Sequence, residues 1–342
     1  MTKRYTIQDI AMLAGVSAAT VSKIMNNNGN ISKATKDKVK AIIEETGYSP
    51  THSAKSLASK KSNLIGIVYA GKINVDFSHP FFNQVLNSFK TQMGLLGYDF
   101  IFFSNEQYKN NYLSRCLHYN VDGVLIVAGD VVEDAIGQLD HSTIPCVGID
   151  IELTGDQSSY VMTNNHKISH LVVEYAYMNS IDRIGMIGGT HDSRISMLRE
   201  EGFREAMNKF CLPIDEKWVT YGDYYEDSGY RMMKKMISQE KELPELIYAF
   251  SDLMALGAIR ALREEGLHVP TDVKFIGCDD IEACRFAEPK LTTIRQDKEK
   301  IGMLAAKLLC NLIDQKNTSR SILVDPELTV RESCGAALNK SR

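Results

Sequence analysis

From residue 63 onward, apolar runs of strand length alternate with stretches of helical periodicity. The first run is LIGIVYA, and the segment after it carries Phe81 and Phe82 among apolar residues at helical spacing. About ten such units follow one another over roughly 270 residues. Apolar strands that alternate with helices form parallel sheets covered on both faces. About ten strand–helix units are more than a single sheet usually contains, so two sheets are expected. This part of the chain is therefore predicted to be an α/β structure of two doubly wound parallel-sheet lobes.

Several polar residues come at or near the ends of the predicted strands and helices. Ligands of parallel sheets bind at the carboxyl ends of the strands, often in a crevice between domains. Carboxylates, an arginine fork and an aromatic face suit a polyhydroxylated ring, because carboxylates accept hydroxyl protons. Each residue also has a structural interpretation, since a strand-end aspartate often caps a helix and an arginine beside glutamates often forms a surface ion pair. The candidates are Asp150, Tyr224, Asp252, Asp279 and Arg199, which opens the predicted helix REEGFREAM.

The residues before this alternation have the pattern of three short helices. Thr6, Ser17 and Ser32 are placed to cap them, and Gly15 and Gly47 are placed to end the first and the third. The tight glycine turn between the first two helices predicts a helix-turn-helix unit. A small helical bundle without a ligand would show the same spacing, so this geometry alone is a weak indication of function.

Charge divides the chain at the same place. Residues 1–62 contain ten Lys or Arg and four Asp or Glu, which gives a net charge of +6. The whole chain carries −4, so the remainder carries −10. A basic head on an acidic body predicts that the head meets a polyanion, although an ordinary solvated basic surface would give the same balance.

The second predicted helix combines a narrow apolar face with short polar side chains on the opposite side. Ser, Thr and Asn side chains of this length can donate hydrogen bonds to phosphate oxygens, and Lys23 can reach a phosphate or a base edge. TIQDIAMLAGVSAATVSKIMNN and the following ISKATKDKVKAIIEETGYSP resemble the opening signature of the lactose-repressor (LacI/GalR) family of bacterial transcription regulators. The resemblance runs almost without gaps over some fifty residues.

In that family, the first two residues after the cap serine and a basic residue four beyond the second read bases. Here these residues are Ala18, Ala19 and Lys23. The alanines offer only methyl contacts, and lysine cannot make the planar bidentate contact to guanine, so the resemblance implies readout that depends also on DNA shape. The DNA-binding residues expected in the head are Thr6, Ser17, Ala18, Ala19, Thr20, Ser22, Lys23, Asn26 and Asn30.

The segment THSAKSLASKKSN, after Pro50, is rich in Ser and Lys, and its composition alone favours a flexible tether. In the family this segment is a hinge helix that pairs with its twin from a second subunit in the minor groove. A leucine from each chain wedges between base pairs and bends the duplex. The resemblance assigns this role to Leu57, with Ala54 and Ala58 on the same helical face and Ser53 near the two-fold contact.

Motifs in the body, among them HPFFNQVLNSFK, REEGFREAM and LTTIRQD, resemble the effector domain of the same family, which is similar to periplasmic sugar receptors. The resemblance places Phe81 and Phe82 on the N-lobe side of a ligand cleft. It places four residues on the C-lobe side, namely Arg199, Tyr224, Asp252 and Asp279. Three departures bear on the ligand, and two of them are substitutions, where His79 replaces the family's usual Asn and Asn164–Asn165 replaces its Asp-Asn pair. The loop before His79 is also longer than usual.

The expected organisation is an N-terminal all-α head followed by a periplasmic-binding-protein-like α/β effector domain. The helix-turn-helix domain covers residues 1–49, the hinge or linker 50–62, and the effector-binding and dimerisation domain 63–342. Within the last, we expect an N-lobe of about 63–163 and 292–325 and a C-lobe of about 164–291 and 326–335.

Other function classes lack their motifs in this sequence. It contains no G-x-S-x-G, P-loop or H-E-x-x-H, and GMIGGT lacks the full G-x-G-x-x-G spacing, so we expect no enzyme. The seven cysteines are scattered and the histidines lack ligand spacing, so we expect reduced thiols, no metal and no cofactor. A polar N-terminus and the absence of a run of about 18 apolar residues predict no signal peptide, no membrane span and a cytoplasmic location.

With the resemblance, these features predict a sequence-specific transcriptional regulator, expected to be a repressor. It would bind a palindromic operator in double-stranded DNA as a homodimer. A dimer is expected in preference to a tail-joined tetramer, since no leucine heptad tail follows the last strand. A small effector, a sugar or sugar phosphate, would control it allosterically from the cleft between the lobes. One alternative is a global carbon-catabolite-type regulator whose co-effector is a phosphocarrier protein. A more distant alternative is a sugar-binding receptor without a DNA role.

Overall fold

The computed structural model describes residues 5–26, 28–49, 61–70, 79–103, 111–128, 134–316 and 319–335. The chain divides into two compact units, Met1–Asn63 and Leu64–Arg342. Each unit has its own buried core. Among the described residues, no helix is both long enough and apolar enough to cross a membrane.

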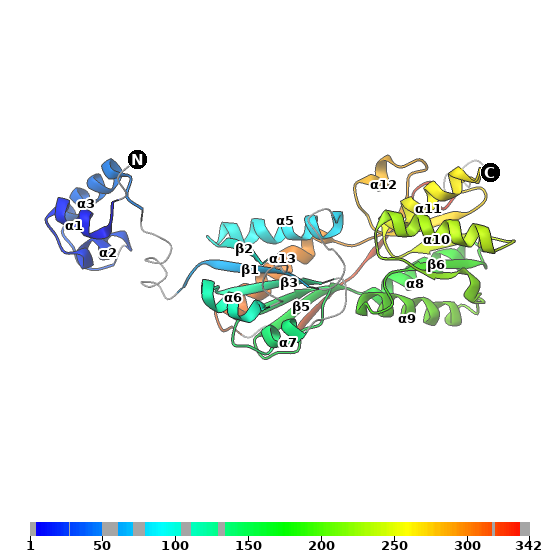
Figure 1. Cartoon of the computed structure of the whole chain (residues 1–342), viewed down its shortest axis with the longest axis horizontal. Coiled ribbons are helices and arrows are strands. Elements are labelled where there is room, and N and C mark those ends of the chain that lie inside the picture. Colours follow the sequence, from blue (N-terminus) through cyan, green and yellow to red (C-terminus); the bar gives the residue numbers. More distant parts are fainter. Residues whose placement is uncertain are drawn as a thin grey trace. The chain divides into compact units, whose positions relative to one another are not determined.

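The described residues of the first unit form three helices, and the expected capping residues begin and end them (Figure 1). They are α1 (Ile7–Ala14), α2 (Ala18–Met25) and α3 (Lys33–Thr46). Asp9 N donates to the Thr6 hydroxyl at 3.3 Å and Thr6 N donates to the Asp9 carboxylate at 2.7 Å, which is a capping box. Ser17 and Ser32 cap α2 and α3, and Gly15 ends α1 with a left-handed φ of 67°.

A small apolar core holds these helices in the helix-turn-helix arrangement. Its buried members come from all three helices and are Ile10, Ala11, Ala14, Val21, Ile24 and Val39. The apolar stripe expected on the second helix therefore faces this core, and its polar side stays available to a partner.

A six-stranded parallel sheet forms the first lobe of the second unit, in the order β11-β5-β4-β3-β1-β2. The strands are β1 (Leu64–Ala70), β2 (Asp99–Phe103), β3 (Gly123–Ala128), β4 (Cys146–Ile149), β5 (Ser158–Thr163) and β11 (Ser321–Val324). The helices are α5 (Pro80–Leu95), α6 (Tyr112–Tyr119), α7 (Asp134–Asp140) and α13 (Lys298–Ile313). Helices α5 and α13 cover one face, and α6 and α7 cover the other (Figure 1). Along β3, Leu125 and Val127 face the first pair while Val124 and Ile126 face the second, as a strand buried on both sides requires.

A second six-stranded sheet, in the order β12-β10-β9-β8-β6-β7, forms the other lobe. Its strands are β6 (Ile184–Gly188), β7 (Val219–Tyr221), β8 (Leu246–Ala249), β9 (Lys274–Asp279), β10 (Thr292–Arg295) and β12 (Glu327–Thr329). The elements around it are α8 (Asn165–Met178), α9 (Arg194–Lys209), the 3-10 turn η1 (Glu216–Trp218), α10 (Glu226–Gln239), α11 (Asp252–Glu264) and α12 (Ala283–Phe286). Helices α8 and α9 pack together, as do α10 and α11 on the opposite face (Figure 1). The two doubly wound lobes predicted from the alternation are confirmed.

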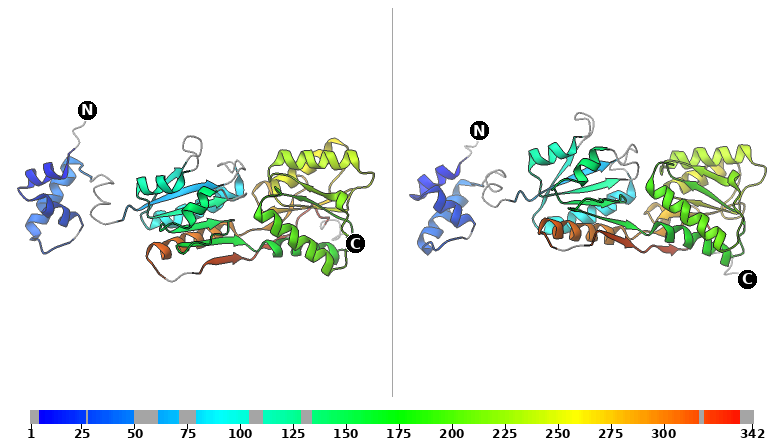
Figure 2. Two further views of the ribbon diagram at one scale, coloured as in Figure 1. Left: turned by 60° about the horizontal axis from the view of Figure 1, so that its bottom comes forward. Right: turned by 90° about the horizontal axis from the view of Figure 1, so that it is seen from below.

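The chain passes between the lobes three times, after β5, after β10 and after β11. Segments distant in sequence thereby lie side by side, with α13 against α5 and β11 beside β5 (Figure 2). The second passage comes later than expected. Strand β10 was predicted to begin the return to the N-lobe at 292, but it pairs with β9 and β12 in the second sheet, so the chain crosses between Arg295 and Lys298.

Candidate functional site

A small cavity of about 40 Å³ lies where the strand ends of the two lobes meet. It is lined by His79, Phe81, Phe82 and Asp150 from the first lobe, by Ile195, Arg199, Tyr224, Tyr225 and Asp279 from the second, and by Gln296 from the passage after β10. Six of the seven residues expected to bind the effector thus share one cavity.

The first-lobe wall is mainly aromatic and is set by the start of α5. Pro80 occupies the first turn of that helix, where its missing N–H is no loss, and the two phenylalanines follow it directly. The rings of Phe81 and Phe82 meet edge to face at 5.0 Å, and the His79 ring lies 5.3 Å from that of Phe82. Asp150 follows β4, is only 8% exposed and has a left-handed φ of 55°.

Arg199 supplies the basic group of the second-lobe wall. It does not open its helix as expected, because α9 begins at Arg194 after the Ser193 cap and Arg199 lies in the second turn. The side chain is 3% exposed, and its Nε donates to Asn165 Oδ1 at 2.9 Å while Nη1 donates to the Phe250 carbonyl. These two bonds fix the orientation of the guanidinium.

Two consecutive tyrosines complete the aromatic lining. The Tyr224 hydroxyl lies 2.6 Å from Ser196 Oγ, and the backbone at Tyr224 is left-handed with a φ of 71°. The ring of Tyr225 meets the His79 ring edge on at 5.4 Å, so the two lobes touch across the cavity through an aromatic pair.

Asp279, at the end of β9, is held from two sides. Gln296 Nε2 donates to Asp279 Oδ1 at 2.7 Å, and Lys298 Nζ donates to the Asp279 carbonyl and, at 3.1 Å, to the Asp280 carbonyl. Both aspartates have positive φ, 124° and 52°, so these contacts stabilise a strained turn. Gln296 Oε1 is buried and has no hydrogen-bond partner among the described residues.

The cavity raises the affinity of its two carboxyl groups for protons. Burial raises the pKa of Asp150 to about 6, against the opposing effect of Arg199. Burial, followed by the nearby Asp252, raises the pKa of Asp279 to about 7, although Arg199 and Lys298 act in the other direction. Near neutral pH, Asp150 is therefore mostly ionised and Asp279 is close to the midpoint of its titration.

Asp252 does not line the cavity, contrary to expectation. It is the fully buried first residue of α11, and its carboxylate accepts from Ile281 N at 2.9 Å and from Thr293 Oγ1 at 2.5 Å. These bonds join α11 to β10 and to the turn after β9. Asp252 does not cap the helix either, because Ser251 is the N-cap of α11.

Four residues that line the cavity were not expected there from the sequence, namely His79, Ile195, Tyr225 and Gln296. Gln296 belongs to LTTIRQD, and His79 stands directly before the expected aromatic pair, so both lay within motifs already singled out. Tyr225 and Ile195 carried no comparable signal, because their positions depend on how the loop after β7 and the start of α9 pack.

The head presents most of its expected DNA-binding residues to solvent. Ala19, Lys23, Asn26, Asn30, Ser17 and Thr6 are exposed, whereas Ala18, Thr20 and Ser22 are half-buried. The hydroxyls of Ser17 and Thr20 lie 2.9 Å apart and take part in capping α2, so a phosphate would compete with an existing contact. Four expected hinge residues, Ser53, Ala54, Leu57 and Ala58, lie outside the described residues.

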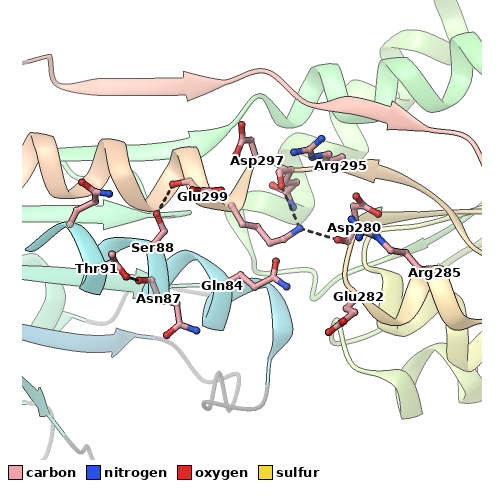
Figure 3. A pocket seen from close by; sticks show the side chains of 13 residues that line it. Gln84, Asn87, Ser88, Thr91, Asp280, Glu282, Arg285, Arg295, Asp297 and Glu299 are labelled. Atoms are coloured by element: carbon pink, nitrogen blue, oxygen red, sulfur yellow. Dashed lines mark hydrogen bonds between the residues drawn. The ribbon is translucent and has the colours of Figure 1, made fainter. Parts of the chain in front are cut away.

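A second and larger hollow, of about 600 Å³, lies beside the cavity and shares Gln296 with it. Figure 3 shows its polar walls, formed by the outer face of α5, the turn after β9 and the start of α13. Ser88 Oγ donates to the Glu299 carbonyl at 2.7 Å and joins α5 to α13 at its floor (Figure 3). Sequence reasoning assigned no role to this groove.

Comparisons with known proteins agree with both halves of this architecture. Residues 6–51 match the model for bacterial regulatory proteins of the lacI family, and residues 173–334 match the periplasmic binding protein-like domain. The HTH-type transcriptional repressor PurR of Actinobacillus pleuropneumoniae serotype 3 (strain JL03) is 33% identical over 335 residues, which are 96% of this chain and 98% of the relative. The chain belongs to the LacI family of bacterial regulatory proteins.

Two solved structures of this kind cover nearly the whole chain. The transcriptional regulator CelR in complex with cellobiose is 29% identical, with a TM-score of 0.73 over 96% of this chain and 100% of that chain. The lac repressor dimer bound to operator and the anti-inducer ONPF is 25% identical, with a TM-score of 0.85 over 97% of this chain and 99% of that chain. This LacI-family chain is thus a DNA-binding transcriptional repressor and not an enzyme.

Proposed function

We propose that this repressor is controlled by a small ligand that binds in the cavity between the lobes. One observation carries the proposal: the cavity draws its walls from both lobes, which already touch there through His79 and Tyr225. A ligand in this position contacts both lobes at once, so its binding free energy depends on how far they are closed. Only such a difference lets a ligand shift a conformational equilibrium.

The size of the cavity supports a change in closure. Its volume of about 40 Å³ holds only a few water molecules, whereas small-molecule sites typically measure about 300–1,000 Å³. The lobes must therefore move apart to admit a ligand. When they close around it, they remain further apart than they are in this structure. The three passages of the chain between the lobes are where we expect this hinge motion.

We infer further that the repressor binds a palindromic operator as a homodimer in the cytoplasm. The net charge of +6 on residues 1–62 and the exposed Lys23 on α2 suit a phosphate-rich partner. A single helix-turn-helix reads only a half-site, so two copies related by a two-fold axis match a palindrome. The lac repressor, named above as a dimer on its operator, is a solved example of this arrangement.

We propose a sugar or a sugar phosphate as the effector class. Buried carboxylates accept hydrogen bonds from hydroxyl groups, and the aromatic walls cover the apolar faces of a ring. The relative CelR was solved with cellobiose, which supports a saccharide.

The test is a thermal-shift screen of the full-length chain against sugars and sugar phosphates, followed by DNA binding with each hit. A true ligand at 100 times its dissociation constant adds about 2.7 kcal/mol to the free energy of unfolding. We expect at least one hit to change the affinity for an operator selected from random DNA. A hit that stabilises the protein but leaves operator affinity unchanged contradicts control through the cavity.

A further inference from the structure

The cavity wall is rich in hydrogen-bond acceptors that the protein itself does not satisfy. Gln296 Oε1 is buried and accepts no hydrogen bond from the described residues, while the amide nitrogen of the same side chain donates to Asp279. The Asp150 side chain, in a residue only 8% exposed, accepts no hydrogen bond from the described residues. Such groups lose their water when a ligand enters, so each needs a donor from the ligand.

Basic groups are scarce in the same wall. Of the residues that line the cavity in the described ranges, Arg199 is the one permanent cation. Its Nε and Nη1 are already bonded to Asn165 and Phe250, and it also balances two carboxyl groups. Lys298 lies behind Asp279, where its ammonium donates to backbone carbonyls and lines the neighbouring groove.

We propose that the effector is an uncharged saccharide whose hydroxyl groups donate hydrogen bonds to Asp150, Asp279 and Gln296, and that the cavity rejects its phosphorylated form. This inference rests on the proposed function and narrows it. A phosphate group is anionic and acts almost entirely as an acceptor, so it would meet an amide oxygen and two carboxyl groups whose charge Arg199 already offsets. Such a juxtaposition of like charges and acceptors in a desolvated site weakens binding of the phosphorylated form.

The pH dependence of binding follows from the same geometry. Arg199 and Tyr224 face Asp150, whereas Asp252, Arg199, Lys298 and Gln296 surround Asp279, and His79 lies across the cavity. A ligand that donates to a carboxylate binds its ionised form, so affinity for an uncharged saccharide rises as pH rises through about 6 to 7. An anionic ligand shows the opposite trend, because protonation of the carboxyl groups removes the repulsion.

The experiment measures the affinity of the full-length chain by calorimetry for matched pairs of probes. The pairs are glucose and glucose 6-phosphate, ribose and ribose 5-phosphate, fructose and fructose 6-phosphate, and cellobiose and its phosphate. We expect at least one uncharged member to bind and its phosphate to bind at least about tenfold more weakly above pH 7. Equal or tighter binding of the phosphorylated partner overturns this inference and leaves the proposed function standing. Binding by no member of any pair overturns the proposed effector class and the inference with it.

A variant of Asp150 tests whether this carboxylate binds the uncharged probe. Asp150→Asn should weaken binding of the uncharged probe at least about tenfold and should reduce the discrimination against its phosphate. Asp156→Asn is the matched control in the same lobe, because its side chain is 97% exposed. The ratio of affinities within each pair for the unaltered chain decides the inference even if the Asp150 variant does not fold. Unchanged discrimination in a folded Asp150→Asn protein overturns the role of this carboxylate.

Discussion

At the scale of single residues, the cavity is built from backbone conformations that side chains rarely adopt. Asp150, Tyr224 and Asp279 all have positive φ, with values of 55°, 71° and 124°. Each such residue costs of order 1–3 kcal/mol, which the surrounding contacts must offset. Strain of this kind clusters at ligand sites, so three such residues around one small cavity support the binding role proposed for it.

Arg199 tests how strongly the cavity depends on one residue. Arg199→Ala removes the donors to Asn165 and Phe250 and leaves two buried carboxyl groups without their cation. We expect a loss of about 2–4 kcal/mol in the free energy of unfolding, measured by urea titration, and loss of ligand binding. Lys209→Ala, at an exposed position of the same helix, should change stability by less than about 0.5 kcal/mol. Normal ligand binding by Arg199→Ala would show that Arg199 does not contribute to ligand binding.

The raised pKa of Asp279 predicts how the free energy of unfolding depends on pH. Its pKa is raised to about 7 in the folded chain from an ordinary value of 3.8, so protonation favours the folded state. The contribution is fully present below about pH 4 and is lost as pH rises through 7, because only the folded chain holds this proton between those two values. Asp279→Asn should therefore flatten the decline in unfolding free energy between pH 4 and 7, measured by urea titrations across that range. An unaltered slope would mean that this carboxyl group titrates normally.

The residues that could and could not be placed from sequence differ in what positions them. Asp150 and Asp279 follow apolar strands, and the carboxyl ends of parallel strands converge, so their meeting was predictable. Asp252 also follows a strand, but Thr293 and the turn at Ile281 capture its carboxylate. That capture depends on contacts between segments distant in sequence, which periodicity cannot reveal.

At the scale of elements, local signals were the reliable ones. The helix caps of the head were found because capping involves residues three apart, as Thr6 and Asp9 show. Strand β10 was assigned to the wrong lobe because a short apolar strand does not reveal its partners. Its pairing with β9 depends on contacts between segments distant in sequence, which a local pattern does not reveal.

Lys298 links two elements that belong to different lobes. It is the first residue of α13, is 8% exposed, and donates to carbonyls of the turn after β9. Lys298→Met leaves these carbonyls unsatisfied, so we expect faster hydrogen exchange in 279–286 and weaker ligand binding. The exposed Lys300→Met, two residues along the same helix, is the matched control. Equal exchange in the two variants would contradict a link between α13 and the strained turn.

At the scale of the whole molecule, we expect the basic unit to bind DNA and the acidic unit to bind the ligand. Each has its own core, so a chain that begins at Leu64 should fold and bind the ligand with unchanged affinity. The same truncation removes α2 and should abolish operator binding, measured by fluorescence anisotropy. Specific operator binding by the truncated chain would refute this division.

Coupling between the two units is reciprocal if the cavity controls the head. A ligand that changes operator affinity by some factor must itself bind to the operator complex with an affinity changed by the same factor, because both describe one coupling free energy. Coupling of this kind is typically about 1–3 kcal/mol, or about 5- to 150-fold. Calorimetry of the ligand with and without saturating operator gives one ratio, and DNA titrations with and without saturating ligand give the other. We expect the two ratios to agree for the full chain and to depart clearly from one. A ratio of one in both titrations would mean that closure of the lobes does not reach the DNA-binding head.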